Sequence, residues 1–329
     1  MDMSLVKFRG ADLFQEEVNF LKKIEDLSDH HFSFKETIPH RPTLDFCAED
    51  HHITEIGIRE LNLSQLPDDI DSLPRLKILY LELLGLEKLP SSIGKLSSLE
   101  KLSLHRNNLS KLPPSIGNLN NLQEFLLFHN QILELPESMG QLSSLKKLHL
   151  DENRVSVIPY FIGELSSLKR LGLKGNPIKT LPESIGNLRN LESLTASVCK
   201  LERIPDSIGN LKSLKWLYLD SNSLTHIPDS IGNLSNLDSL YLNKNHITTL
   251  PDTIGKLESL DQLTFKHNNL TSVPESIGNL KKLKLLDVSN NHLTNLPNSI
   301  GKLKSLEQLW LQKNQITELP ESIGDLSSL

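Results

Sequence analysis

Cysteines, aromatic residues and long apolar runs are all scarce in this chain of 329 residues, and the scarcity excludes several classes of protein. Two cysteines, Cys47 and Cys199, are too few for a disulfide framework. No stretch approaches the roughly 18 consecutive apolar residues of a membrane span. Residues 1–14 lack the basic flank and apolar run of a signal peptide. We therefore expect a cytoplasmic protein, or a secreted one if an upstream signal is missing.

The chain also lacks an excess of basic residues. It carries 35 Lys and Arg against 41 Asp and Glu, a formal net charge of −6. Residues 1–65 hold 13 acidic and 7 basic side chains, and the remainder is balanced. Because no basic patch is present, the sequence does not favour nucleic acid or an anionic membrane surface as a partner.

Motifs for catalysis and metal binding are missing too. Three "IGKL" segments lack the glycine spacing and the Lys-Ser/Thr pair of a phosphate-binding loop. His30, His31 and His40 precede "DFCAEDHH", but these residues do not have the spacing of metal ligands. Ser, His and Asp are scattered, without a nucleophile elbow. We expect no enzymatic activity, no metal and no cofactor.

What the chain has in abundance is a repeat of 23 residues, in the pattern L-P-x-x-I-G-x-L-x-x-L-x-x-L-x-L-x-x-N-x-L-x-x. The pattern resembles the leucine-rich repeat family, whose core is L-x-x-L-x-L-x-x-N/C-x-L. This 23-residue version is similar to the Ras-group intracellular repeat proteins of plants and animals, and to arrays in bacteria and archaea. Eleven full units follow one another without insertion, beginning at Leu66, Leu89, Leu112, Leu135, Ile158, Leu181, Ile204, Ile227, Leu250, Val273 and Leu296.

Each conserved position within the repeat has a physical reason. Leu148 and Leu150 alternate with His149, the period-two pattern of a short strand whose leucines point inward. Stacked units then pair these strands into one parallel sheet. Asn153 follows, where its amide can satisfy backbone groups left unpaired by the bend. Cys199 takes the same position in its own unit, which gives it a structural role.

The other half of each unit predicts an outer wall of short turns. Pro136 suits the first position of a helical turn, and an acidic residue such as Glu137 suits the positive end of that turn. Gly140 is expected to end the turn with positive φ. The predicted fold is an α/β repeat solenoid, a right-handed leucine-rich repeat horseshoe. Parallel strands line its concave face, and short helical or 3₁₀ turns form its convex face.

The two ends of the array should differ from its middle. Residues 10–28 have helical apolar spacing, with Asp12 as N-cap, so residues 1–50 are predicted to be a capping helix and a linker. The repeat domain then spans 51–329, with a half repeat at 51–65, full repeats at 66–318 and a partial repeat at 319–329. Leu319, Ile323, Leu326 and Leu329 would form an exposed apolar rim, which indicates truncation or self-association through an uncapped end.

The variable positions on the concave face predict the function. Both Trp and three of the four Tyr fall there, and such side chains anchor protein interfaces. We expect Trp216, Tyr218 and Tyr241 to lie side by side, with Asp220 at their margin. The predicted protein-binding residues on this face are Trp216, Tyr218, Tyr241, Trp310, Asp220, Phe128, Leu126, Lys174, Arg170 and Tyr80.

These observations favour a non-enzymatic scaffold that binds a protein or peptide along its concave face. Two alternatives stay open on the sequence. The chain could be the sensing arm of a larger signalling protein, such as a GTPase, truncated at its C-terminus, or it could be an exported adhesin. Fold resemblance does not choose among them.

Overall fold

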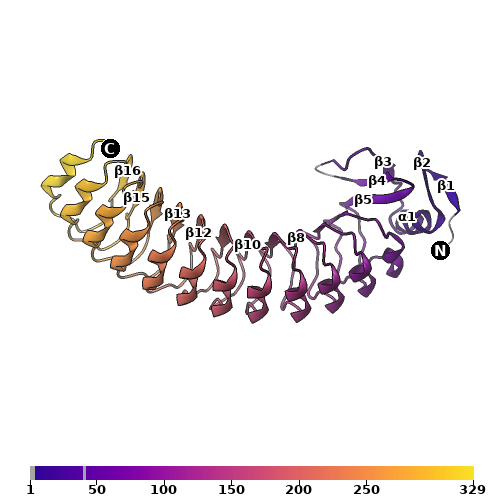
Figure 1. Ribbon diagram of the computed structural model, residues 1–329, viewed down its shortest axis with the longest axis horizontal. Coiled ribbons are helices and arrows are strands. Elements are labelled where there is room, and N and C mark those ends of the chain that lie inside the picture. The colour runs from indigo at the N-terminus through magenta and orange to yellow at the C-terminus, as the bar shows by residue number, and fades with distance from the viewer. Residues whose placement is uncertain (1–3, 40–41) are drawn as a thin grey trace. The chain divides into compact units, whose positions relative to one another are not determined.

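The computed structural model describes residues 4–39 and 42–329, so His40 lies outside the described residues. The chain forms two compact units, unit 1 ending at Val155 and unit 2 spanning Ser156–Leu329. Within each unit, short strands line one side of the coils and 3₁₀ helices line the other (Figure 1). This is the leucine-rich repeat solenoid that the sequence predicts.

Unit 1 combines an N-terminal region with the first coils of the array. Its strands β3 to β9 form a sheet in chain order, in which β4 and β5 are antiparallel and the other described pairs are parallel. The elements are β1 (Leu5–Phe8), β2 (Ala11–Phe14), α1 (Gln15–Ser28), β3 (Ser33–Phe34), β4 (Leu44–Glu49), β5 (His52–Arg59), η1 (Asp68–Ser72), β6 (Ile78–Glu82), η2 (Ser91–Lys95), β7 (Lys101–Ser103), η3 (Pro114–Asn118), β8 (Glu124–Leu126), η4 (Glu137–Gln141) and β9 (Lys147–His149).

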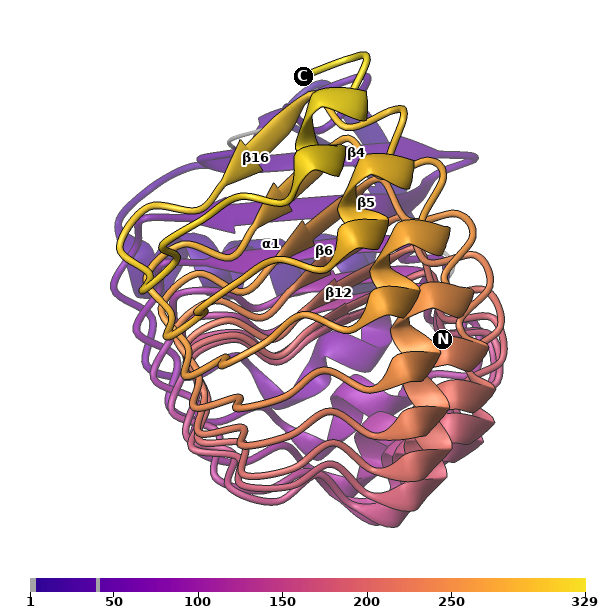
Figure 2. The same ribbon diagram turned by 90° about the vertical axis from the view of Figure 1, so that its left-hand side faces the viewer.

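Unit 2 is regular from one end to the other, and Figure 2 shows its coils stacked with their 3₁₀ helices in a single file. Its strands pair in parallel without a register shift. The elements are η5 (Tyr160–Glu164), β10 (Arg170–Gly172), η6 (Glu183–Asn187), β11 (Ser193–Thr195), η7 (Asp206–Asn210), β12 (Trp216–Tyr218), η8 (Asp229–Asn233), β13 (Ser239–Tyr241), η9 (Asp252–Lys256), β14 (Gln262–Thr264), η10 (Glu275–Asn279), β15 (Leu285–Asp287), η11 (Asn298–Lys302), β16 (Gln308–Trp310) and η12 (Glu321–Asp325).

The repeated asparagine forms the predicted ladder. Asn222 Oδ1 accepts a hydrogen bond from the N–H of Leu201 (3.0 Å), while Nδ2 donates to the carbonyl oxygens of Ala196 (2.8 Å) and Leu219 (2.9 Å). One side chain therefore bonds to two backbone groups of the preceding coil and to one of its own coil. Cys199 Sγ, in the same position, donates to the carbonyl oxygen of Leu173 at 3.4 Å.

Glycine at the sixth repeat position is required for a different reason than the sequence suggested. The prediction of positive φ at Gly140 is wrong, because the described glycines with positive φ are Gly10, Gly85 and Gly175. At Gly209, in the same repeat position, a Cβ atom would lie 2.4 Å from the carbonyl oxygen of Ser230 in the next coil. The missing side chain thus lets the backbones of neighbouring coils approach closely.

The left-handed residue of each repeat comes instead just before the asparagine position. In unit 2 it is a glycine only at Gly175, and elsewhere it includes Val198 (φ 56°), Ser221 (φ 57°) and Lys244 (φ 54°). The proline is also displaced by one residue, because Pro136 is extended (φ −67°, ψ 140°) and precedes η4. The predicted 3₁₀ turns and their acidic first residues are confirmed.

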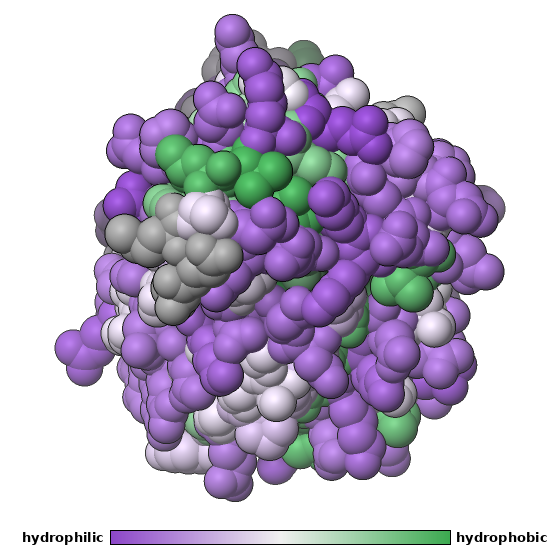
Figure 3. Space-filling model, turned by 90° about the vertical axis from the view of Figure 1, so that its right-hand side faces the viewer, coloured by the Kyte–Doolittle hydropathy of each residue, from purple (hydrophilic) through white to green (hydrophobic). Residues whose placement is uncertain are grey.

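The N-terminal region contains more strand than the sequence indicated. Helix α1 begins at Gln15, and the predicted N-cap, Asp12, lies within β2 of a hairpin with β1. The residues interpreted as a linker include β3 and β4, which extend the sheet beyond β5. Figure 3 views the molecule from its N-terminal side, where the surface is mostly hydrophilic with small separate hydrophobic areas. The domain boundary at residue 50 stays a prediction.

Two buried glutamates hold α1 in place. Glu17 accepts a hydrogen bond from the N–H of Ile53 (2.6 Å) and lies 2.5 Å from His52 Nδ1. Burial raises the pKa of the Glu17 carboxyl above its ordinary value. Burial would also raise the pKa of Glu25, but hydrogen bonds from Arg9 and from the Phe32 N–H lower it below its ordinary value.

The strand face as a candidate binding surface

We call the outward side of the strands the strand face. The leucines of each strand are buried inside the coil, so the side chains between them point the opposite way. Parallel pairing in register then aligns equivalent residues of successive repeats. Trp216, for example, lies between Ser193 and Ser239, and Tyr218 lies beside Tyr241.

Trp216, Tyr218 and Tyr241 form an aromatic cluster on the strand face of unit 2. The rings of Tyr218 and Tyr241 stack with centroids 4.9 Å apart and an interplanar angle of 5°. The Tyr241 hydroxyl donates a hydrogen bond to Gln262 Oε1. Burial, with a contribution from Tyr241, raises the pKa of Tyr218 above its ordinary value. The predicted adjacency of the two tyrosines is confirmed, while their role in binding stays a prediction.

Trp216 is half-buried at one side of this pair. Its neighbours in the sheet, Ser193 and Ser239, have short side chains, and its own side chain is partly exposed. The ammonium of Lys215 lies 5.8 Å from the centre of the Trp216 ring system. An amphipathic surface of this kind can contact both apolar and polar atoms of a ligand.

Asp220 has a structural function in addition to its predicted place at the margin. Its Oδ1 accepts a hydrogen bond from the N–H of Asn243 (3.0 Å), and Asn243 Oδ1 accepts one from the N–H of Lys266 (2.8 Å). Ser197 Oγ also donates to Asp220 Oδ2 (3.5 Å). Burial raises the pKa of the Asp220 carboxyl above its ordinary value. These contacts form a second ladder along the strand face.

The other predicted residues of unit 2 do not join the cluster. Trp310 is 46 % exposed and lies three strands from Tyr241, at roughly 14 Å for strands about 4.8 Å apart. Arg170 and Lys174 are exposed on β10 and its C-terminal extension, two strands from Trp216. The predicted residues therefore fall into separate groups.

Unit 1 has a smaller aromatic group on its own strand face. Phe128 stacks on the imidazole of His105, with ring centroids 4.3 Å apart and an interplanar angle of 10°. The ammonium of Lys101 lies 5.2 Å from the ring centroid of Tyr80 and 3.3 Å from Glu124. Leu126, on β8, projects from the same face between Glu124 and Phe128. Among the described residues, no ring stacking or ion pair joins Tyr80 directly to Phe128.

Sequence reasoning missed a buried polar cluster beneath Phe128. Ser103 Oγ donates to Glu82 Oε1 (2.9 Å) and lies 3.0 Å from His105 Nδ1. Burial, together with nearby cations, lowers the pKa of His105 to about 4, so the imidazole is neutral at pH 7. Because Ser103 is fully buried, no substrate can reach its hydroxyl, and the cluster positions Phe128 rather than forming a nucleophile. The signal in the sequence was the pair of polar residues Glu82 and His105 at equivalent positions of two neighbouring repeats, with Ser103 two residues before His105.

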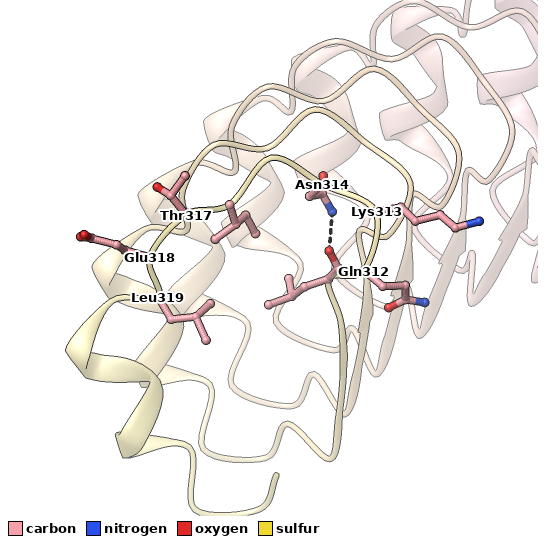
Figure 4. Close-up of a pocket in the computed structure, with 8 residues that line it drawn as sticks. Gln312, Lys313, Asn314, Thr317, Glu318 and Leu319 are labelled. Atoms are coloured by element: carbon pink, nitrogen blue, oxygen red, sulfur yellow. Dashed lines mark hydrogen bonds between the residues drawn. The ribbon is translucent and has the colours of Figure 1, made fainter.

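The last coil exposes part of its core. Leu319 and Leu329 are 53 % and 58 % exposed, whereas Leu326 is buried, so the predicted four-residue rim is only partly formed. A shallow pocket opens beside Leu319 and is lined by Leu311, Gln312, Lys313, Asn314, Ile316, Thr317, Glu318 and Leu319 (Figure 4). Within it, Asn314 Nδ2 donates to the carbonyl oxygen of Leu311 (2.8 Å).

Membrane-spanning helices and metal-binding clusters are both absent from the part of the chain that the structure describes. No helix there is both long and apolar enough to cross a bilayer. Within residues 4–39 and 42–329, no three His, Cys, Asp or Glu side chains gather closely enough to hold a metal ion.

Comparison with known proteins identifies the repeat. The sequence profile of the leucine-rich repeat region matches residues 94–171, 160–244 and 239–329. The chain belongs to the leucine-rich repeat family. A leucine-rich repeat protein of Leptospira interrogans is 36 % identical with a TM-score of 0.71, over 83 % of this chain and 76 % of that one. No curated protein matches the chain.

Two further solved leucine-rich repeat proteins come from complexes. PEPR1, solved with AtPEP1, is 29 % identical with a TM-score of 0.68, over 84 % of this chain. The present chain spans only 44 % of PEPR1. FLRT2 was solved in a complex with Latrophilin 3 and Unc5D, and the matching chain of that complex is 26 % identical with a TM-score of 0.61, over 77 % of this chain and 79 % of that one.

Proposed function

We propose that this leucine-rich repeat chain is a non-enzymatic module that binds a peptide or protein segment on the strand face of unit 2. Trp216, Tyr218 and Tyr241 are its anchors. The observation that carries the proposal is the parallel stack of the two tyrosines, which is held by a hydrogen bond from Tyr241 to Gln262. A ligand that covers this stack does not need to order it, so little conformational entropy is lost on binding.

The composition of the cluster supports the same function. Trp and Tyr supply large contact areas and a polar atom each, and they are enriched at the energetic centres of protein interfaces. Three of the six Trp and Tyr residues of this chain lie on the neighbouring strands β12 and β13. RGFR1, a plant peptide hormone receptor solved with RGF2, is a neighbour of comparable fold that supports a peptide as one kind of ligand.

The proposal is tested by selecting phage-displayed random peptides on the full chain and measuring the affinity of a selected peptide by calorimetry. We expect Trp216→Ala or Tyr241→Ala to weaken binding by about 2 kcal/mol, roughly 30-fold, because each removes an anchor. Tyr160→Ala is the matched control, since Tyr160 is in the same unit, on η5, and is 70 % exposed. Equal affinity in the two cluster variants and the control would disprove the proposal.

We propose a second copy of the chain as a further partner, bound at the last coil. The exposed side chains of Leu319 and Leu329 support this, because apolar surface of this kind favours association. Sedimentation at increasing protein concentration should reveal dimers, and the double variant Leu319→Glu/Leu329→Glu should remain monomeric. If the native chain is monomeric throughout, this contact does not form.

A further inference from the structure

We infer that the ligand carries an anionic side chain three or four residues from an aromatic or large aliphatic one, with Arg170 binding the anionic group. This inference rests on the proposed function, because it assigns the chemistry of a ligand on the same face. It is carried by the charges and the side-chain sizes along strands β10 to β13.

Arg170 is the cation of the proposed site. Some lysines of unit 2 form an ion pair with an acidic residue one repeat away, as Lys215 does with Glu192 (3.3 Å) and Lys284 with Asp261 (2.8 Å). Arg170 is exposed on β10 and makes no side-chain hydrogen bond or ion pair within the described residues. A guanidinium can bind a carboxylate or phosphate through two parallel hydrogen bonds.

The residues beside Arg170 are small. Gly172 follows on the same strand and has no side chain, and Ser193 and Thr195 on β11 are short. The next strand, β12, then presents the large rings of Trp216 and Tyr218. A ligand over β10 and β11 therefore meets small residues, with a cation on one side and aromatic rings on the other.

The distance between strands predicts how far apart the two binding side chains of the ligand lie in its sequence. Arg170 lies two strands from Tyr218 and three from Tyr241, a separation of roughly 10–14 Å. An extended peptide advances about 3.3 Å per residue, so its anionic and apolar side chains should be three or four residues apart. Asp220, close to the tyrosines, disfavours an acidic residue there and so places the ligand's anion at the β10 side.

The test compares phage-displayed random peptides selected on the full chain with those selected on the Arg170→Glu variant. The native chain should enrich peptides with Asp or Glu three or four positions from Phe, Trp, Tyr or Leu. The variant should enrich Lys or Arg at that position instead. Affinity of a native-selected peptide should fall about 10- to 100-fold with Arg170→Ala, the loss expected for a charge-assisted hydrogen bond.

Controls keep the two proposals separable. Lys256→Glu, a charge reversal at the end of η9, should not change the selection, and circular dichroism should confirm that each variant is folded. Synthetic peptides with Glu or phosphoserine at the anionic position decide which anion binds more tightly. Selected peptides that need Trp216 and Tyr241 but show no acidic preference would overturn this inference alone. Failure to enrich any peptide, or binding that ignores Trp216 and Tyr241, would overturn both.

Discussion

Replacing one asparagine of the ladder should destabilise the chain more than its exposed surface suggests. In Asn222→Ala, the N–H of Leu201 and the carbonyl oxygens of Ala196 and Leu219 lose their partner together. Each unsatisfied buried group costs about 1–3 kcal/mol. Because a carbonyl oxygen can accept a second bond and water can partly enter, we expect the lower end of the sum, about 3 kcal/mol.

Two measurements test this expectation. Urea unfolding followed by circular dichroism gives the change in the free energy of unfolding, and hydrogen exchange of the Leu201 amide reports the local loss. Asn190→Ala is the control, because its amide donates a single exposed hydrogen bond to Ser166 (2.9 Å), and its effect should stay below about 0.5 kcal/mol. A loss below about 1 kcal/mol in Asn222→Ala, with unchanged exchange at Leu201, would refute the reasoning.

Three other substitutions probe separate features. Gly209→Ala should lower the free energy of unfolding by about 3 kcal/mol or prevent folding, because its Cβ would meet the carbonyl oxygen of Ser230 at 2.4 Å. Gly324→Ala is the control, and it should be tolerated in the same melting experiment because no atom lies within 4 Å of its added Cβ. Val198→Asn should raise the free energy of unfolding by about 1 kcal/mol, since a β-branched residue is strained at φ 56° and Asn is not; a lower midpoint in urea would contradict this. The pKa of His105 is lowered to about 4 in the folded chain, so the unfolded chain binds more protons between pH 6.5 and 4. The free energy of unfolding should therefore fall over this range as the pH drops, by at most about 3 kcal/mol. In His105→Gln, this contribution to the pH dependence should be missing.

The repeat made much of the fold predictable. Leu148, His149 and Leu150 alternate, and Asn153 follows at a fixed distance, so strand, face and ladder could all be inferred from a single unit. The role of the repeat glycine could not be inferred in this way. Positive φ and close backbone approach both exclude a side chain, and only the position of the next coil distinguishes them.

Irregular parts of the chain gave less reliable predictions. The turn at Asp50 and His51, with φ of 48° and 68°, joins β4 to β5, and the alternating residues around it could have predicted this hairpin. The interpretation of residues 10–28 as one helix missed β2, because four extended residues fit within a helical pattern of apolar residues.

The sequence predicted which face carries the candidate site, but not which of its side chains contact one another. Alternation assigns Tyr218 and Tyr241 to one side of neighbouring strands, and the structure stacks them. The stacking of Phe128 on His105 depends on rotamers, and these are set by the buried group of Glu82 and Ser103. No repeat pattern encodes such a choice.

The uniform junction between coils has a consequence for how this surface can change. Because the coils around residues 227–249 meet through the same glycine and asparagine contacts, a deletion of these 23 residues joins two ends that already fit. Losing residues 227–249 would remove Tyr241 and bring Thr264 beside Tyr218. Duplicating the same segment would add a third ring to the stack. Gain and loss of whole units can therefore alter ligand preference in a single genetic event, without a new fold.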